Sequence, residues 1–405
     1  ESGKSTITQF LENLRQKIQD IIRALGIVPG GSNNNSSEYA GEPVNMCTGN
    51  YVNDIWGLTL RGDMELSFVR HYNSQFVQSG PLGVGWSHSL DCALKIEGDE
   101  VTVCWGNGRQ ERFDRDESGA FVHIFGGYDT LEQMEDGYCY TTREGKKSFF
   151  STQGRITRIQ DRAGHGLSFT YEEDRMVRAA ASEERWIQLS YNEEGLLARL
   201  TDSMDREVSF QYDGVLLQSA SSADGTSEQY EYDGNSRLSA IINAAGVRIL
   251  ENTFDEEGRV VHQRFPDGTE MRYEYRDDHV VFTDRNGSQA VYYHDQRLRH
   301  TCTRFAVGEE SYTYNDKNER ITYTDLNGSI WKREFDESGN VISLTDPLGQ
   351  VTRYQYDARG LLTFVSAPDG GETRMAYDEN SNMTEIVDAA GSRQTTVYQD
   401  GRVVE

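Results

Sequence analysis

The fold of this chain follows from a stretch near its C-terminal end, residues 335–360, which reads FDESGNVISLTDPLGQVTRYQYDARG. Residues 341–345 and 351–356 are rich in β-branched and aromatic side chains, which favour strands. The runs between them contain Asp, Asn, Pro and Gly, which favour turns. Because side chains alternate between the faces of a strand, Tyr354 and Tyr356 are predicted to share one sheet face. The stretch therefore predicts two antiparallel strands and two turns.

The end of this unit belongs to a repeated motif, Tyr-x-Tyr-Asp-x-x-Gly or a close variant, that returns about every 21 residues. Its second aromatic position recurs twelve times, at Tyr171, Tyr191, Tyr212, Tyr232, Phe254, Tyr275, Tyr293, Tyr314, Phe335, Tyr356, Tyr377 and Tyr398. A fixed period in this range indicates a repeat architecture in which each unit packs on its neighbours. Two strands to a repeat predict a meander of about two dozen strands, and accumulated twist makes so long a sheet coil or close.

The acid of each motif is predicted to form a turn. Asp357 stands at a strand end, where its carboxylate accepts backbone N–H groups of an Asx-type turn. Gly360 supplies the positive φ that closes such a turn. We therefore interpret the twelve aromatic positions as structural repeat positions and assign no acid to a catalytic, cofactor or metal site.

Three segments upstream of the array share a second pattern. Residues 42–51 read EPVNMCTGNY, residues 70–74 read RHYNS and residues 83–87 read GVGWS. Together with the repeats, these segments resemble the bacterial Rhs/YD-repeat polymorphic toxins, a family related to the Tc toxin shell and the teneurins. The upstream positions that carry the resemblance are Pro43, Val44, Thr48, Gly49, Arg70, Tyr72, Asn73, Gly83, Gly85 and Trp86.

The resemblance implies an all-β fold whose YD repeats coil into a curved sheet, the wall of a hollow shell. It implies a non-catalytic part in toxin delivery, in which the shell encloses a C-terminal toxin domain of the same polypeptide. The sequence contains neither a recognisable toxin domain nor the family's Asp-containing self-cleavage core, so we expect the N-terminal cap and early wall. It also implies a secreted or cell-surface protein of interbacterial competition, exported by a specialised secretion system rather than by a signal peptide in this chain.

The chain is predicted to have four regions. Residues 1–28 contain apolar side chains at helical spacing and predict a short amphipathic helix. Residues 29–40 predict a flexible linker, and residues 41–150 predict a pre-repeat β-domain that caps the array. Residues 151–405 hold the repeats, and we expect the array to continue beyond them. The helix either packs on the same chain or docks to a secretion-machinery or chaperone partner, and both alternatives stay open.

Composition disfavours several partners. A net charge of −26, from 66 acidic and 40 basic residues, makes a nucleic acid or an anionic membrane an unfavourable partner. No stretch approaches the ~20 apolar residues of a membrane-spanning helix. The five cysteines are widely spaced and form no CxxC or Cys/His pattern, which favours free thiols and predicts no metal site or cofactor.

Two other functional classes stay open beside the shell. A cell-surface adhesion or carbohydrate-binding module requires the tyrosine rows to face solvent, and the burial of Tyr354 and Tyr356 separates it from the shell. A glycan-cleaving enzyme requires a pair of carboxylates, which sequence separation alone does not identify. The Ser87–His88 dipeptide does not form a nucleophile and its base, because adjacent strand residues point to opposite faces.

Overall fold

The computed structural model describes residues 38–76, 79–124, 127–399 and 402–403, and all regular structure within them is β. The all-β prediction is confirmed. The helix predicted in residues 1–28 lies outside the described residues, as does the predicted linker up to residue 37. The last two linker residues form strand β1 (Tyr39–Ala40), which pairs with β2 (Val44–Asn45).

Residues 38–123, which we call the inner module, form four small antiparallel sheets: β1-β2, β3-β4-β7, β5-β6 and β8-β9-β10-β11. The remaining strands of this module are β3 (Val52–Leu60), β4 (Leu66–Asn73), β5 (Ser79–Gly80), β6 (Gly83–Val84), β7 (Trp86–His88), β8 (Ala93–Glu97), β9 (Glu100–Cys104), β10 (Gln110–Arg115) and β11 (Phe121–His123).

The rest of the chain forms one antiparallel sheet of 27 strands, β12 to β38, in which each strand pairs with the next along the chain. Its strands are β12 (Thr130–Met134), β13 (Gly137–Thr141), β14 (Lys147–Ser151), β15 (Ile156–Gln160), β16 (Gly166–Glu172), β17 (Arg175–Ser182), β18 (Arg185–Tyr191), β19 (Leu197–Asp202), β20 (Glu207–Asp213), β21 (Leu216–Ser221), β22 (Ser227–Tyr232), β23 (Leu238–Ile242), β24 (Arg248–Phe254), β25 (Val260–Arg264), β26 (Glu270–Tyr275), β27 (His279–Thr283), β28 (Gln289–His294), β29 (His300–Phe305), β30 (Gly308–Tyr314), β31 (Arg320–Thr324), β32 (Ile330–Phe335), β33 (Val341–Thr345), β34 (Val351–Tyr356), β35 (Leu362–Ser366), β36 (Glu372–Tyr377), β37 (Met383–Val387) and β38 (Arg393–Thr395). A two-stranded hairpin, β39 (Tyr398–Gln399) and β40 (Arg402–Val403), follows.

Each repeat contributes two strands and two turns, as the period predicts. The strands predicted at residues 341–345 and 351–356 coincide with β33 and β34. Asp357 Oδ1 accepts the backbone N–H groups of Arg359 and Leu361, each at 2.9 Å, and Gly360 has a φ of 73°. The turn-forming role predicted for this acid is confirmed. The sheet begins at β12, within the region predicted as residues 41–150, and the division into domains stays a prediction.

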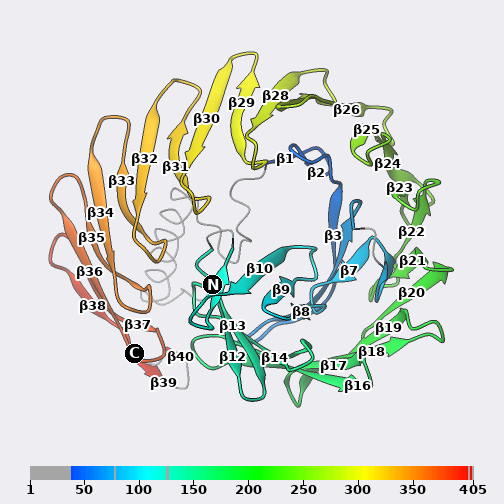
Figure 1. Ribbon diagram of the computed structural model, residues 1–405, viewed down its shortest axis with the longest axis horizontal. Helices are drawn as coiled ribbons and strands as arrows, with labels where there is room; N and C mark the ends of the chain where they lie inside the picture. The colour runs from blue at the N-terminus through cyan, green and yellow to red at the C-terminus, as the bar shows by residue number, and fades with distance from the viewer. Residues whose placement is uncertain (1–37, 77–78, 125–126, 400–401, 404–405) are drawn as a thin grey trace, which may run out of the picture.

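The sheet curves into an almost complete ring, with the inner module inside it (Figure 1). Its first strands meet its later turns: Arg143, after β13, donates from Nη1 to the carbonyl of Gly339, after β32, at 2.6 Å. Lys317 Nζ lies 4.3 Å from the ring centroid of Tyr128, so a second contact joins the same two parts of the sheet. The sheet is therefore a coil whose beginning touches a later part of itself.

One large core joins the inner module to the concave face of the coil. Trp86 and Phe68 of the module are fully buried, as are Ile187, Leu200 and Val260 of the sheet. A second, smaller core lies in the late repeats, where Val341 and Tyr354 are buried against partly buried neighbours. The inner module thus supplies much of the apolar surface that the early coil packs against.

Candidate functional site: the concave face and its inner module

The inner module crosses the inside of the ring in the direction opposite to the strand order of the sheet. Its contacts with the sheet fall in reversed overall order: Glu38–His300, Glu42–Gln263, Gly49–Val260, Tyr72–Leu238, Pro81–Leu197 and Leu94–Gly154. Several of these are backbone hydrogen bonds, such as Leu197 N–H to the carbonyl of Pro81 at 2.8 Å. The chain therefore lines the concave face from β29 back to β15 before it enters the sheet at β12.

Residues of the upstream motif meet tyrosines of the repeats at this interface. Trp86 Nε1 donates to the hydroxyl of Tyr232 at 2.9 Å. Tyr72 accepts the backbone N–H of Leu238 on its hydroxyl at 2.7 Å, which fixes the ring at the start of β23. The sequence indicates both sets of residues separately, and the structure places them in contact.

Arg70 is the charged residue at the centre of this interface, and its side chain is only 3% exposed. Its Nη1 donates to the hydroxyl of Tyr230 at 2.7 Å, and its Nη2 lies 3.7 Å from a carboxylate oxygen of Glu228. The guanidinium carbon is 5.8 Å from the ring centroids of Trp86 and Tyr230. A buried cation is costly without such partners, so these contacts fix Arg70 and the inner module on the concave face of the sheet.

Two motif glycines allow the module to approach the wall closely. Gly49 has a φ of 68°, and a Cβ there would lie 2.4 Å from Cβ of Arg259. Gly83 has a φ of 90°, and a Cβ there would lie 2.2 Å from the carbonyl oxygen of Val215. Any larger side chain at either position would push the module away from the concave face.

The other motif positions shape the inner module itself. Val44 is fully buried, and the carbonyl of Pro43 accepts the Val52 N–H at 3.2 Å. Thr48 Oγ1 accepts the Asn50 N–H at 3.3 Å, Asn73 donates its N–H to the carbonyl of Gly85 at 2.9 Å, and a Cβ at Gly85 would contact the Tyr72 ring. Their assignment as site residues stays a prediction.

At seven of its twelve occurrences, the second aromatic position of the motif donates a hydrogen bond to the preceding part of the sheet. Tyr212 donates its hydroxyl to the carbonyl of Leu197 at 2.6 Å, and Tyr356 donates to the carbonyl of Val341 at 2.9 Å. The same bond joins Tyr191 to Met176, Tyr232 to Leu217, Tyr275 to Val260, Tyr314 to His300 and Tyr377 to Leu362. Phe254 and Phe335 carry no hydroxyl, and Tyr171, Tyr293 and Tyr398 lie at the corresponding positions in β16, β28 and β39.

Family models match three segments of the chain. Residues 137–258 match the Teneurin YD-shell, residues 335–371 match the RHS Repeat, and residues 41–113 match a Domain of unknown function (DUF6531). The chain belongs to the Rhs/YD-repeat family.

Solved toxin structures are similar to this Rhs/YD-repeat chain at low identity. A Photorhabdus luminescens Tc holotoxin pore chain is 11% identical, with a TM-score of 0.40, over 88% of this chain and 22% of that one. The TcdB2-TccC3 crystal structure is 12% identical, with a TM-score of 0.42, over 91% of this chain and 24% of that one. The chain thus spans about a quarter of the length of these structures. A search of curated protein sequences returns no match.

A buried acidic network ties the inner module of this Rhs/YD-repeat protein to the start of the coil. The Tyr140 hydroxyl lies 2.9 Å from Oε2 of Glu111 and within hydrogen-bond distance of Asp129, so the two carboxylates share its one proton, and Arg109 forms ion pairs with both. Burial raises the pKa of Asp129, whereas at Glu111 burial is outweighed by hydrogen bonds from His123 and Tyr140 and by the Arg109 charge, which lower its pKa. Because hydrogen bonds and ion pairs engage both carboxylates, the network holds β10 against β13.

The same cluster borders a cavity of about 600 Å³, which Asp129, Arg109 and Trp105 help to line. Glu111 and Asp129 stand 18 residues apart in different segments and share no motif, so neither is a candidate from the sequence. A carboxylate pair of this kind has no local signal in the sequence.

The described residues lack the features of two other kinds of site. They contain no group of three or more His, Cys, Asp or Glu placed to hold a metal ion. None of their elements is a helix with the length and hydropathy of a membrane span. All five cysteines are free, which confirms the prediction of free thiols, and burial raises the pKa of Cys47 to about 11.

Proposed function

We propose that this chain is the N-terminal cap and early wall of an Rhs-type polymorphic toxin, whose complete shell encloses a C-terminal toxin domain of the same polypeptide. The observation that carries the proposal is the coiled sheet with the inner module fastened along its concave face from β29 to β12. A module in that position blocks the inside of the coil at its first turn, which is the work of a cap. In this role the chain is non-catalytic and needs no cofactor.

The same proposal covers delivery. The toxin is secreted or displayed at the cell surface of a bacterium, and a specialised secretion system exports it for interbacterial competition. Residues 1–28 act there as a docking helix for the secretion machinery or a chaperone. Membership of the Rhs/YD-repeat family supports this setting. Deleting residues 1–28 is expected to abolish export and leave the shell intact, whereas normal export of the deletion variant would contradict the docking role.

Imaging of the intact polypeptide by electron cryomicroscopy tests the shell. We expect residues 130–395 to continue into a closed wall with additional protein density inside. A matched polypeptide that ends before the toxin domain is the control and should give the same wall around an empty interior. A compact sandwich in place of a curved wall, or a toxin domain outside the wall, would refute the proposal.

The tyrosine rows give little support to the adhesion alternative. Tyr354 is only 6% exposed, and Tyr230, which holds the equivalent position in an earlier repeat, is 3% exposed and in contact with Arg70. A sugar needs an accessible aromatic face, and these rings do not offer one.

A further inference from the structure

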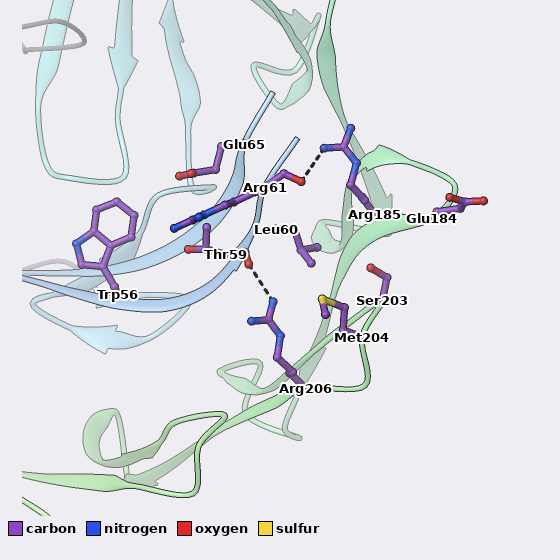
Figure 2. A pocket seen from close by; sticks show the side chains of 10 residues that line it. All are labelled: Trp56, Thr59, Leu60, Arg61, Glu65, Glu184, Arg185, Ser203, Met204 and Arg206. Atoms are coloured by element: carbon purple, nitrogen blue, oxygen red, sulfur yellow. Dashed lines mark hydrogen bonds between the residues drawn. The ribbon is translucent and has the colours of Figure 1, made fainter. Parts of the chain in front are cut away.

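A pocket of about 790 Å³ lies between the β3–β4 hairpin of the inner module and two turns of the wall (Figure 2). One turn precedes Arg185 at the start of β18, and the other carries Met204 between β19 and β20. Trp56, Arg61 and Glu65 come from the hairpin. In Figure 2, the Arg61 guanidinium and the Glu65 carboxylate point to the side of the hairpin on which Trp56 lies.

The pocket is held in shape by hydrogen bonds from wall to hairpin. Arg206 donates from Nη2 to the carbonyl of Thr59 at 2.9 Å, while its Nε donates to the buried carboxylate of Asp202 at 2.8 Å. Arg185 donates from Nη1 to the carbonyl of Arg61 at 3.1 Å. Both bonds end on the hairpin backbone, so they hold the hairpin against the wall, and one carboxylate oxygen of Glu65 also accepts the Ser67 hydroxyl at 2.6 Å.

Trp56 is a large apolar side chain that is exposed and not part of the core. It is 65% exposed, whereas Trp86 of the same module is fully buried. Register shifts by a bulge in β3 between Trp56 and Thr59, and bulges commonly re-aim a side chain. Within the described part of the chain, no ring or guanidinium is stacked on the Trp56 indole. Met204, across the pocket, is 66% exposed.

The charges around the pocket balance. Arg206 is neutralised by Asp202, and the other charged side chains that line the pocket are the guanidinium groups of Arg61 and Arg185 and the carboxylates of Glu65 and Glu184. Such a set offers planar donors and acceptors without a net charge. A phosphate or a nucleic acid would meet two carboxylates here, so the balance disfavours an anionic ligand.

An exposed indole beside balanced donors and acceptors matches the two faces of a sugar. The C–H face of a pyranose ring packs on an aromatic plane, and its hydroxyls both donate to carboxylates and accept from guanidinium groups. We propose that this pocket binds a neutral saccharide, whose ring stacks on Trp56 and whose hydroxyls bind Arg61 and Glu65. The protein thereby carries a glycan-recognition site between its inner module and the sheet, separate from the concave tyrosine rows.

A glycan array with the full 405-residue chain tests the site, using neutral oligosaccharides of glucose, galactose, mannose and N-acetylglucosamine beside sialylated and sulfated ones. We expect binding to a subset of the neutral sugars. Trp56→Ala should weaken that binding about tenfold or more, and Glu65→Gln should weaken it less. Leu348→Ala, which alters a side chain that is 82% exposed far from the pocket in sequence, is the matched control and should bind normally.

Thermal unfolding of each variant separates lost binding from lost folding, because Trp56 contributes little buried surface. Binding confined to acidic sugars, binding that Trp56→Ala leaves unchanged, or binding to no sugar would each overturn the proposal. The shell proposal is tested by imaging and does not depend on any of these outcomes.

Discussion

The early coil and the late repeats share one motif but differ in what packs on it. In the early coil, Ile187, Leu200 and Val260 are 0% exposed, because the inner module covers the concave face. In β35 and β37 of the late repeats, every residue is only partly buried. At the start of the inner module, Glu38 lies 3.7 Å from His300 of β29. The motif therefore specifies the strands and turns of the sheet, while the extensive burial of the early coil depends on a second layer; the late repeats bury only a small core around Val341 and Tyr354.

The largest expected effect comes from removing the main contact between the layers. Trp86 is fully buried, 5.0 Å from the ring centroid of Tyr230, so Trp86→Ala should cost about 3–5 kcal/mol. Native-state hydrogen exchange should show faster exchange across β16 to β25 and no change in β32 to β38. Tyr354→Ala is the counterpart in the late repeats and should affect only β32 to β36. If both substitutions increased hydrogen exchange over the same strands, the two-layer description would be contradicted.

A pair of glycines sharpens the same comparison. Gly83 and Gly349 both have positive φ, 90° and 78°, so alanine at either position carries a backbone cost of about 1 kcal/mol. A Cβ at Gly349 meets nothing within 4 Å, whereas one at Gly83 meets a wall carbonyl. We expect Gly83→Ala to cost about 1–3 kcal/mol more than Gly349→Ala in denaturant unfolding. Similar midpoints for the two variants would show that the module does not need this close approach.

The buried histidine of the inner module predicts a pH dependence. His88 is 1% exposed, its ring nitrogens have no hydrogen-bond partner among the described residues, and burial, with a smaller effect of His71, lowers its pKa from 6.5 to about 3. Below pH 6.5 the unfolded chain therefore binds a proton that the folded protein does not, and the free energy of unfolding falls as pH falls through that window.

Two pH units below the unfolded-state pKa of 6.5, the free energy of unfolding is lower by about 3 kcal/mol because of His88. His88→Leu should remove this part of the pH dependence while keeping the stacking position on Phe68 filled. Unfolding of wild type and variant across this pH range measures the difference, which cancels the many carboxylates that both proteins share. Parallel pH profiles would show that His88 stays solvated in solution.

Local chemistry in the sequence predicts the wall well and the interior poorly. The period, the strands β33 and β34 and the Asp357 turn all depend on residues within one repeat, and the sequence shows them directly. The position of the inner module depends instead on contacts between residues far apart in the sequence. Arg70 and Tyr230, for example, are 160 residues apart, and no periodicity connects them. For the same reason the sequence does not distinguish the exposed Trp56 from the buried Trp86. The difference in exposure comes from the bulge in β3 beside Trp56 and from the sheet that covers Trp86.

The smallest expected effect tests whether the inner module changes the strength of the tyrosine hydrogen bond that links neighbouring strands at seven of the twelve motif positions. Tyr212 donates to the carbonyl of Leu197, which is 0% exposed, and Tyr377 donates to the carbonyl of Leu362, which is half-buried. Removing either hydroxyl costs a net hydrogen bond, but water can reach the freed carbonyl only in the late repeat.

Tyr212→Phe should therefore cost about 1–2 kcal/mol of local opening free energy and Tyr377→Phe about 0.5 kcal/mol, measured by hydrogen exchange at the affected strands. The natural Phe254 and Phe335 show that the ring alone fits the position in both parts of the sheet. A cost at Tyr377 equal to that at Tyr212 would mean that the bond has the same strength with or without a second layer. The difference between the early and late coil would then reside in apolar burial alone.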